Sequence, residues 1–238
     1  MTTTFAPSEI VAAEEAEPPQ RWAPTLEVDA ATPGVLYFAP LEVVVEATIT
    51  TLPQKFVDQK IAAGWWQDSL VKPRLESPPI DRYWNWSSAS IEYEGRILPS
   101  EKVAVITDDG EVQGAMHVAT EPVPSVYEPG ASAAFIELLF TAPRNRPNLT
   151  RHGRPYYLGV GASLLKWAAR LSRRLGCGGR LKLDASPECV AWYARRGFVL
   201  LDVGPVEFEG VWYRPMELPL AAVNRVLAPP RLYSSSAA

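Results

Sequence analysis

Cysteine and histidine are scarce in this chain, and both shortages narrow its chemistry. The 238 residues include two cysteines, Cys177 and Cys189, and two histidines, His117 and His152. Two cysteines cannot form a disulfide framework, so we expect reduced thiols in a cytoplasmic protein. Neither histidine has a cysteine or an aspartate at ligand spacing, so we expect no metal site and treat both as ordinary strand or loop residues.

A basic excess and a long apolar run are also missing. Lysine and arginine number 23 against 27 aspartates and glutamates, which gives a formal net charge of −4. Nucleic-acid-binding domains usually carry a basic excess, so we expect no nucleic-acid partner. No apolar run reaches the 18 residues or so that a membrane helix needs, so we expect no membrane partner either. Residues 1–18 lack a basic segment followed by an apolar one, which predicts no secretory signal.

Apolar side chains are plentiful, and prolines gather near both ends. Hydrophobic residues make up 47% of the chain, which is enough for a sizeable core. The terminal segments combine proline with alanine, glutamate or serine, and such segments bury too little apolar surface to fold. We therefore expect a flexible arm over 1–34, a single domain over 35–227 and a flexible tail over 228–238.

The order of the predicted elements favours a mixed α/β fold, in which helices cover a central mixed sheet. Asp109-Gly110 lies between two apolar runs, which is a strong hairpin signal because glycine accepts positive φ. Leucine and alanine recur at spacings of three and four before Gly176, which predicts a helix. Ser186-Pro187 predicts the start of a second helix, with Ser186 as its N-cap. We expect strands over 41–49, 103–106, 112–116, 134–141, 181–183, 198–201 and 211–214, and helices over 53–70, 162–175 and 186–197.

Two glycines, Gly159 and Gly161, open the helix predicted over 162–175. Glycines at the start of a helix let the backbone approach a bulky anion, and the first N–H groups and the helix dipole then attract it. The spacing fits neither a nucleotide-triphosphate loop nor a dinucleotide fingerprint. A pyrophosphate group would suit such a site. The alternative is a glycine turn that only packs the helix against the sheet.

Three sequence blocks, in this order and spacing, resemble the GCN5-related N-acetyltransferases over about 103–214. The segment 136–143, IELLFTAP, resembles the central strand of that superfamily, which ends in proline. The segment 159–162, GVGA, resembles its pyrophosphate loop, and 191–198, AWYARRGF, resembles its Phe-Tyr-x-x-x-Gly-Phe block. The resemblance implies a mixed sheet flanked by helices, with acetyl-CoA as co-substrate and an amine as acceptor.

The resemblance also implies a set of residues that contact the coenzyme. Tyr156 departs from the pattern, because the superfamily usually has glutamine or arginine three residues before the first glycine. The preceding loop carries Arg144, Arg146, Arg151 and Arg154, which either supply the missing cation or form a solvated basic loop. The coenzyme-binding residues that we expect are Leu139, Phe140, Thr141, Arg154, Tyr156, Tyr157, Leu158, Gly159, Val160, Gly161 and Ala162.

Glu137 and Tyr193 are the catalytic residues that the resemblance implies. Glu137 is a carboxylate in an apolar strand, where desolvation would raise its pKa toward that of a useful base. Its alternative role is to face solvent or to pair with an arginine. Tyr193 holds the general-acid position, and its alternative role is that of a core aromatic. The backbone N–H groups near Phe140 and Thr141 would stabilise the acyl oxygen, provided that the strand splays locally.

We therefore expect an N-acetyltransferase that transfers acetyl directly within a ternary complex, because the sequence indicates no activated cysteine or serine. A non-catalytic acyl-CoA sensor on the same fold is the alternative, and the net charge disfavours a toxin that acylates charged tRNA. The tryptophan-rich segments 64–66 and 83–86 either line the acceptor pocket or cover the sheet; we favour the second for most rings. The acceptor can be a small molecule, a peptide or a protein, and pairing of the closing strands across a homodimer is left open.

Overall fold

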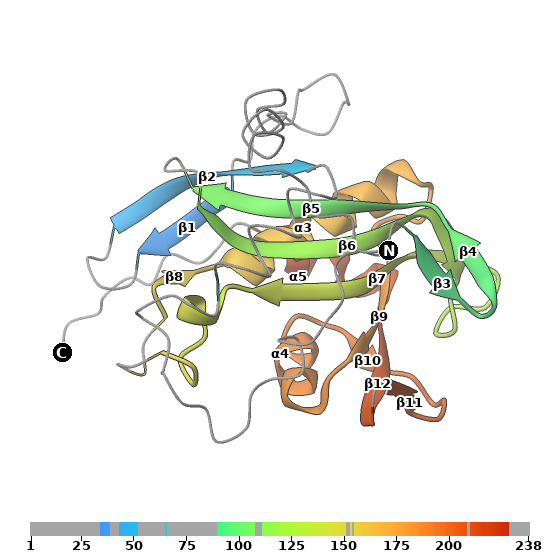
Figure 1. Cartoon of the computed structure of the whole chain (residues 1–238). Coiled ribbons are helices and arrows are strands. Elements are labelled where there is room, and N and C mark those ends of the chain that lie inside the picture. Colours follow the sequence, from blue (N-terminus) through green and yellow to red (C-terminus); the bar gives the residue numbers. More distant parts are fainter. Residues whose placement is uncertain are drawn as a thin grey trace, which may run out of the picture.

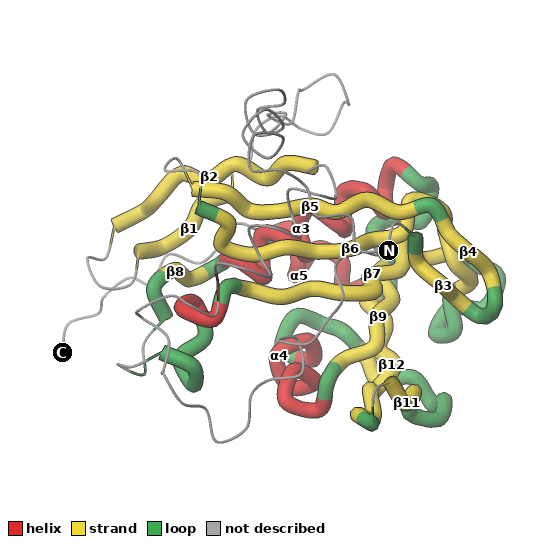
Figure 2. Tube along the Cα trace, in the orientation of Figure 1, coloured by secondary structure: helices red, strands yellow, loops and turns green. Residues whose placement is uncertain are grey.

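A ten-stranded mixed sheet forms the centre of the molecule (Figures 1 and 2). The computed structural model describes residues 34–38, 43–51, 65, 90–107, 111–150, 153, 155–208 and 210–228. The strands are β1 (Gly34–Phe38), β2 (Val43–Thr51), β5 (Ser100–Thr107), β6 (Val112–Pro124), β7 (Ser132–Thr141), β8 (Tyr157–Leu158), β9 (Leu181–Ala185), β10 (Val199–Leu200), β11 (Val206–Phe208) and β12 (Val211–Leu218). Their order is β10-β12-β9-β7-β6-β5-β2-β1-β8, with β11 paired to β12.

Among the described residues, three helices and a small hairpin complete the fold. The helices are α3 (Val160–Arg174), α4 (Val190–Ala194) and α5 (Val223–Leu227), and the 3-10 turns are η3 (Pro143–Asn145), η4 (Pro187–Cys189) and η5 (Leu220–Ala222). Strands β3 (Ile91–Tyr93) and β4 (Arg96–Leu98) form the separate hairpin. Among the described strands, the pair β7–β9 is parallel and its neighbours are antiparallel, which places a change of direction at the centre of the sheet.

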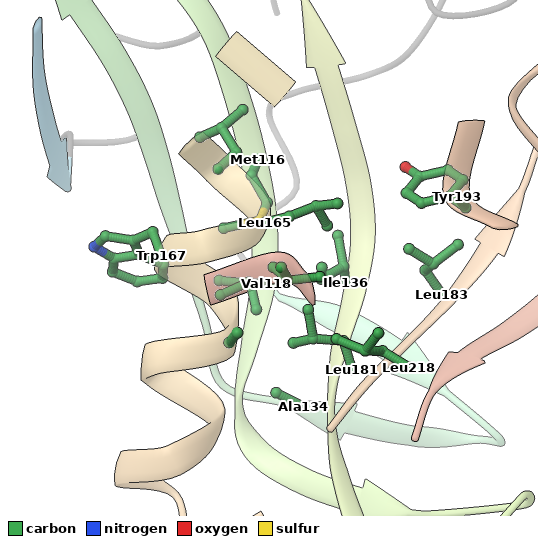
Figure 3. Close-up of a cluster of buried hydrophobic side chains, with 14 of the residues drawn as sticks. Met116, Val118, Ala134, Ile136, Leu165, Trp167, Leu181, Leu183, Tyr193 and Leu218 are labelled. Atoms are coloured by element: carbon green, nitrogen blue, oxygen red, sulfur yellow. The ribbon is translucent and has the colours of Figure 1, made fainter. Parts of the chain in front are cut away.

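The two faces of the sheet bury different clusters. Helix α3 packs on one face against alternate residues of β5, β6, β7 and β9, because strand side chains alternate between faces (Figure 3). Met116, Val118 and Ile136 belong to this cluster. On the other face, the β3–β4 hairpin covers Phe135. His117, Phe135 and Glu137, which alternate with these α3-facing residues, therefore point away from α3.

The mixed α/β class is confirmed, and most of the predicted elements are present. The two strands of the predicted hairpin pair as β5 and β6, and the strand predicted over 134–141 is β7. Helix α3 begins at Val160, two residues before its predicted start. The helix predicted from 186 is divided into η4 and α4. Ser186 is the N-cap residue of η4, as predicted, although its side chain makes no capping hydrogen bond within the described chain. The predicted helix over 53–70, apart from Trp65, the turn 108–110, the arm 1–33 and the tail 229–238 lie outside the described residues.

Gly114 on β6 fixes how closely α3 approaches the sheet. A Cβ atom at this position would lie 2.4 Å from Val160 Cγ1 and 3.0 Å from the Phe140 carbonyl oxygen. We expect Gly114→Ala to lower the free energy of unfolding by about 1–3 kcal/mol, because the first turn of α3 must move outward. Urea unfolding measures the change. The matched control is Gly204→Ala, where a Cβ would have no described atom within 4 Å; equal stability of the two variants would contradict this packing.

Candidate active site

Strands β7 and β9 part in the middle of the sheet. Their parallel pairing covers three residue pairs and ends at Ile136 and Leu183. Strand β7 continues to Thr141 and β9 to Ala185, so both strands extend past the last pair. Beyond this pair the two strands diverge, and the region between their ends is called the gap below (Figure 1). The splay that the resemblance required is therefore present at the predicted strand.

A β-bulge places Glu137 at the mouth of this gap. In the β6–β7 register, His117 pairs with Leu138 and the next residue, Val118, pairs with Ile136. Glu137 is thus the extra residue between two consecutive pairs. A bulge re-aims its side chains relative to a regular ladder, and here it turns Glu137 toward His117, on the face away from α3.

Glu137 is the end of a chain of three polar side chains on neighbouring strands. Its Oε2 lies 2.7 Å from His117 Nδ1, and His117 Nε2 lies 2.7 Å from Ser100 Oγ. The Glu137 side chain is 32% exposed and the His117 side chain 2%. The carboxylate therefore reaches the accessible end of the network, while the imidazole lies inside the sheet face. The partner of Glu137 is thus a histidine and not the arginine of the predicted alternative, and the carboxylate is partly exposed to solvent. Its role as a base stays a prediction.

Tyr193 approaches the same gap from α4. Its ring packs edge-on against Trp192 and Phe198, with centroid distances of 4.9 and 5.3 Å. Burial raises the pKa of the Tyr193 phenol well above its ordinary value, an effect that nearby Arg196 opposes. Figure 3 shows the hydroxyl directed from α4 toward β7, with Leu183 beside the ring. The side chain is therefore a core aromatic whose hydroxyl stays protonated and is directed toward β7. Its role as general acid stays a prediction.

The two glycines at the start of α3 have different surroundings. Gly159 is exposed, is the N-cap residue and has φ of 91°, a left-handed conformation that favours glycine. Gly161 is buried, and a Cβ there would lie 3.1 Å from the Trp192 ring and 3.7 Å from Thr141 Cγ2. The packing alternative therefore explains Gly161, whereas Gly159 and its neighbour Leu158 are exposed at the start of the helix.

Tyr156 carries a cation on its ring in place of the usual cationic residue. The Arg144 guanidinium lies 5.4 Å from the ring centroid, and Tyr156 N–H donates to the Arg144 carbonyl oxygen at 2.9 Å. Arg144 also donates to Gln113 at 3.3 Å and lies 3.7 Å from Glu111. These contacts hold Arg144 against Gln113 of β6 and against Tyr156, which precedes β8.

Arg146 is bound to the end of β7. Its Nε and Nη2 donate to the Thr141 carbonyl oxygen at 2.8 and 2.6 Å. Asn145 connects the same loop to β6 and β8, because its side chain donates to the Gln113 carbonyl oxygen and accepts from Tyr157 N–H. These bonds fix the backbone that leads to Gly159.

Some of the other predicted coenzyme-binding residues are buried in the core, and the rest keep accessible surface. Tyr157 and Val160 are buried in the α3-side core, and Tyr157 N–H is already bound to Asn145. Leu139 packs against the same core, and Phe140 is buried with its ring 4.7 Å from that of Trp65. The remaining members keep accessible surface near the gap or the helix start: Thr141, Tyr156, Leu158, Gly159 and Ala162. Arg151 and Arg154 lie outside the described residues.

Trp65 is the one described member of the tryptophan-rich segments. It is buried, and its indole N–H donates to the Val112 carbonyl oxygen at 2.9 Å. The interpretation that most of these rings cover the sheet is therefore confirmed for Trp65.

Sequence reasoning missed Ser100 and His117. The hairpin register could have placed His117 opposite Lys102, with Ser100 two residues further along the same face. Nothing in the sequence indicates the bulge that turns Glu137 toward this pair.

Among the described residues, no cluster of three or more histidine, cysteine, aspartate or glutamate side chains could hold a metal ion. None of the described helices is long and apolar enough to cross a membrane. Cys177 and Cys189 are both free thiols.

The resemblance to acetyltransferases extends to solved structures. A nourseothricin acetyltransferase is 23% identical over 52% of this chain and 70% of its own, with a TM-score of 0.37. An acyl-CoA N-acyltransferase from Pseudomonas aeruginosa is 17% identical over 51% of this chain and 69% of its own, with a TM-score of 0.36. A chimera of the spermidine N-acetyltransferase of Vibrio cholerae is 13% identical over 77% of this chain and 99% of its own, with a TM-score of 0.43.

No protein-family model matches the sequence, and no curated protein is a detectable relative of it. The solved structures named above are all acyltransferases by name. Because these matches are distant, the residues around the splayed strands carry the functional argument.

Proposed function

We propose that this chain is an acyl-CoA-dependent N-acyltransferase that transfers acetyl from acetyl-CoA to a primary amine. The observation that supports this most is that β7 and β9 stop pairing one residue before Glu137, while the Tyr193 hydroxyl of α4 is directed toward β7. The Glu137 carboxylate and the protonated Tyr193 phenol would be the base and the acid that amine acylation needs.

The start of α3 is where the coenzyme phosphates would bind. Leu158 and Gly159 are exposed, and the N–H groups and dipole of a 15-residue helix favour anions at this end. Arg144, which lies on the Tyr156 ring, adds positive charge on the preceding loop. The thioester would then enter the gap beside the part of β7 that follows Ile136.

The reaction needs one proton removed and one supplied. As the amine nitrogen attacks the thioester carbonyl, Glu137 accepts a proton from it, and the new carbon–nitrogen bond forms. When the carbon–sulfur bond breaks, Tyr193 donates its phenolic proton to the leaving thiolate. Burial of Tyr193 keeps the phenol protonated over the whole working pH range. Stabilisation of the acyl oxygen by backbone N–H groups near Phe140 and Thr141 stays a prediction.

Direct transfer remains the preferred route, although the structure contains a serine–histidine–glutamate chain. Ser100 has the hydrogen-bond connectivity of a nucleophilic triad with His117 and Glu137. In the β5–β6 register, however, Ser100 pairs with Ala119, beyond His117 and away from the splayed end of β7. A thioester in the gap would therefore meet Glu137 before Ser100. Intact-mass measurement after incubation with acetyl-CoA tests this, and an acetyl group retained on Ser100 would establish the covalent route.

Release of free thiol from acetyl-CoA in the presence of a panel of amines tests the proposed function. We expect amine-dependent release at a rate that increases with the fraction of neutral amine. The panel should include polyamines, an aminoglycoside, amino acids and lysine peptides, because the acceptor class is open. Binding of acetyl-CoA without thiol release on any amine would favour the acyl-CoA sensor instead.

Tyr193→Phe should distinguish the general-acid role of the Tyr193 hydroxyl from the packing role of its ring. The variant keeps the ring that packs between Trp192 and Phe198, so we expect unchanged stability and acetyl-CoA binding, and a kcat lowered about 100-fold. Because the pKa of Tyr193 is raised, the wild type should show no loss of kcat from deprotonation of this phenol up to about pH 10. A kcat profile over pH for both proteins measures this. Equal kcat values would leave Tyr193 a core aromatic only.

A further inference from the structure

We propose that Ser100 and His117 are positioning residues for the Glu137 base, and that the charge of His117 controls how strongly Glu137 accepts a proton. The three side chains are called the Ser100–His117–Glu137 network below. This inference rests on the proposed function for its kinetic consequence, but its structural part can be tested without any substrate.

The geometry of the network fixes one tautomer of His117. An ionised carboxylate only accepts hydrogen bonds, so the 2.7 Å contact with Glu137 Oε2 requires a proton on Nδ1. In the neutral imidazole, Nε2 is then an acceptor, and the Ser100 hydroxyl at 2.7 Å can donate to it. Ser100 thus selects the tautomer that points its N–H at Glu137, and every ring nitrogen of the buried imidazole is hydrogen-bonded.

The protonated form of His117 fits the same positions. An imidazolium donates from both nitrogens, and the Ser100 hydroxyl oxygen can accept from Nε2 after its own hydrogen rotates away. The proton that converts one form into the other therefore arrives on the Ser100 side, and Glu137 keeps its contact with Nδ1. The network can change charge without changing shape.

A charge change on His117 should act directly on Glu137. A positive imidazolium at 2.7 Å stabilises the carboxylate as an anion and so lowers its affinity for the proton of the amine. The neutral imidazole orients the carboxylate without this loss of basicity.

Other charged groups on this face of the sheet influence whether His117 is neutral or protonated. Lys102 of β5 is opposite His117 in the register and is 6% exposed, so its charge disfavours a second positive charge beside it. Lys182 of β9 lies on the same face over Phe135, where its Nζ donates to the Tyr93 hydroxyl of β3 at 2.6 Å. Asp184, two residues after Lys182 on β9, is a carboxylate whose pKa is raised by burial. Glu137 is the described carboxylate that contacts the imidazole directly.

Histidine NMR tests the network itself. The chain has two histidines, so selective ¹⁵N labelling gives two sets of signals, and His117→Asn assigns them. We expect His117 with its proton on Nδ1 at high pH, and a titration midpoint that falls by about 1 pH unit or more in Glu137→Gln. Glu111→Gln, an exposed residue outside the network, should leave the midpoint unchanged. An unchanged midpoint in Glu137→Gln would overturn the proposal, whatever the protein catalyses.

Kinetics tests the consequence. His117→Asn keeps an N–H near the Nδ1 position but cannot become charged, so its acidic limb should move to lower pH by about 1 pH unit. His117→Leu also removes the donor and should lower kcat about 100-fold at every pH, because the carboxylate is no longer oriented. The proposal would be overturned if the acidic limb of the kcat profile were the same in His117→Asn and the wild type, or if His117→Leu kept full activity. If no acyl transfer is found while the NMR result holds, the proposed function fails and the network stands.

Discussion

Replacement of Glu137 by glutamine is expected to lower kcat about 100- to 10,000-fold and to leave acetyl-CoA binding unchanged. The amide has the size of the carboxylate and can still accept from His117 Nδ1, but it cannot take a proton from the attacking amine. The decrease of kcat in Glu137→Gln should be largest at the pH where the acceptor amine is mostly protonated. Steady-state kinetics with the best amine of the panel, beside calorimetric titration of acetyl-CoA, measures both quantities.

The matched control for this variant is Glu92→Gln, which makes the same change on the exposed face of β3. It should keep the wild-type kcat. A Glu137→Gln enzyme within about threefold of the wild type would contradict the base assignment, since a general base normally contributes at least 100-fold. A variant that also loses acetyl-CoA binding would mean that Glu137 supports the gap and not the proton transfer.

Replacement of Gly159 by aspartate is expected to weaken acetyl-CoA binding about thirtyfold relative to its replacement by asparagine. Gly159 has φ of 91°, so both side chains cost similar backbone strain, and both residues tolerate this region better than most. The aspartate alone adds a negative charge at the helix start, where repulsion of the coenzyme phosphates costs about 2 kcal/mol.

The comparison between the two Gly159 variants isolates the charge. Equal affinities would show that the phosphates do not bind at the start of α3. Gly161 is a poorer choice for such a test, because any side chain there meets the Trp192 ring and the loss of binding would have two causes.

Local patterns in the sequence predicted the parts of the site that depend on neighbouring residues. The Asp109-Gly110 signal predicted the β5–β6 pairing, the apolar run predicted β7, and the leucine periodicity predicted α3 to within two residues. Each of these signals acts over a few residues of chain. The second helix failed in detail, because Pro187 and the short distance to Gly197 leave room for a 3-10 turn and a single five-residue helix.

The parts that the sequence could not predict depend on contacts between distant segments. The bulge at Glu137 arises from the register of β6 against β7, and the splay arises from where β9 stops pairing with β7. His117 lies 20 positions before Glu137 and 17 after Ser100, so the sequence shows three separate polar residues. Similarly, the stacking of Arg144 on Tyr156 could not be inferred from a four-arginine loop, although it provides a cation near the predicted place.

Calorimetric titration of the purified wild-type chain with acetyl-CoA, beside the Gly159→Asn and Gly159→Asp variants, shows whether the chain binds the coenzyme at the start of α3. We expect one site per chain with a Kd of about 1–100 μM, kept in the asparagine variant and weakened in the aspartate variant. A folded wild-type protein that shows no binding heat with acetyl-CoA or with longer acyl-CoA molecules at any temperature tested would contradict this expectation.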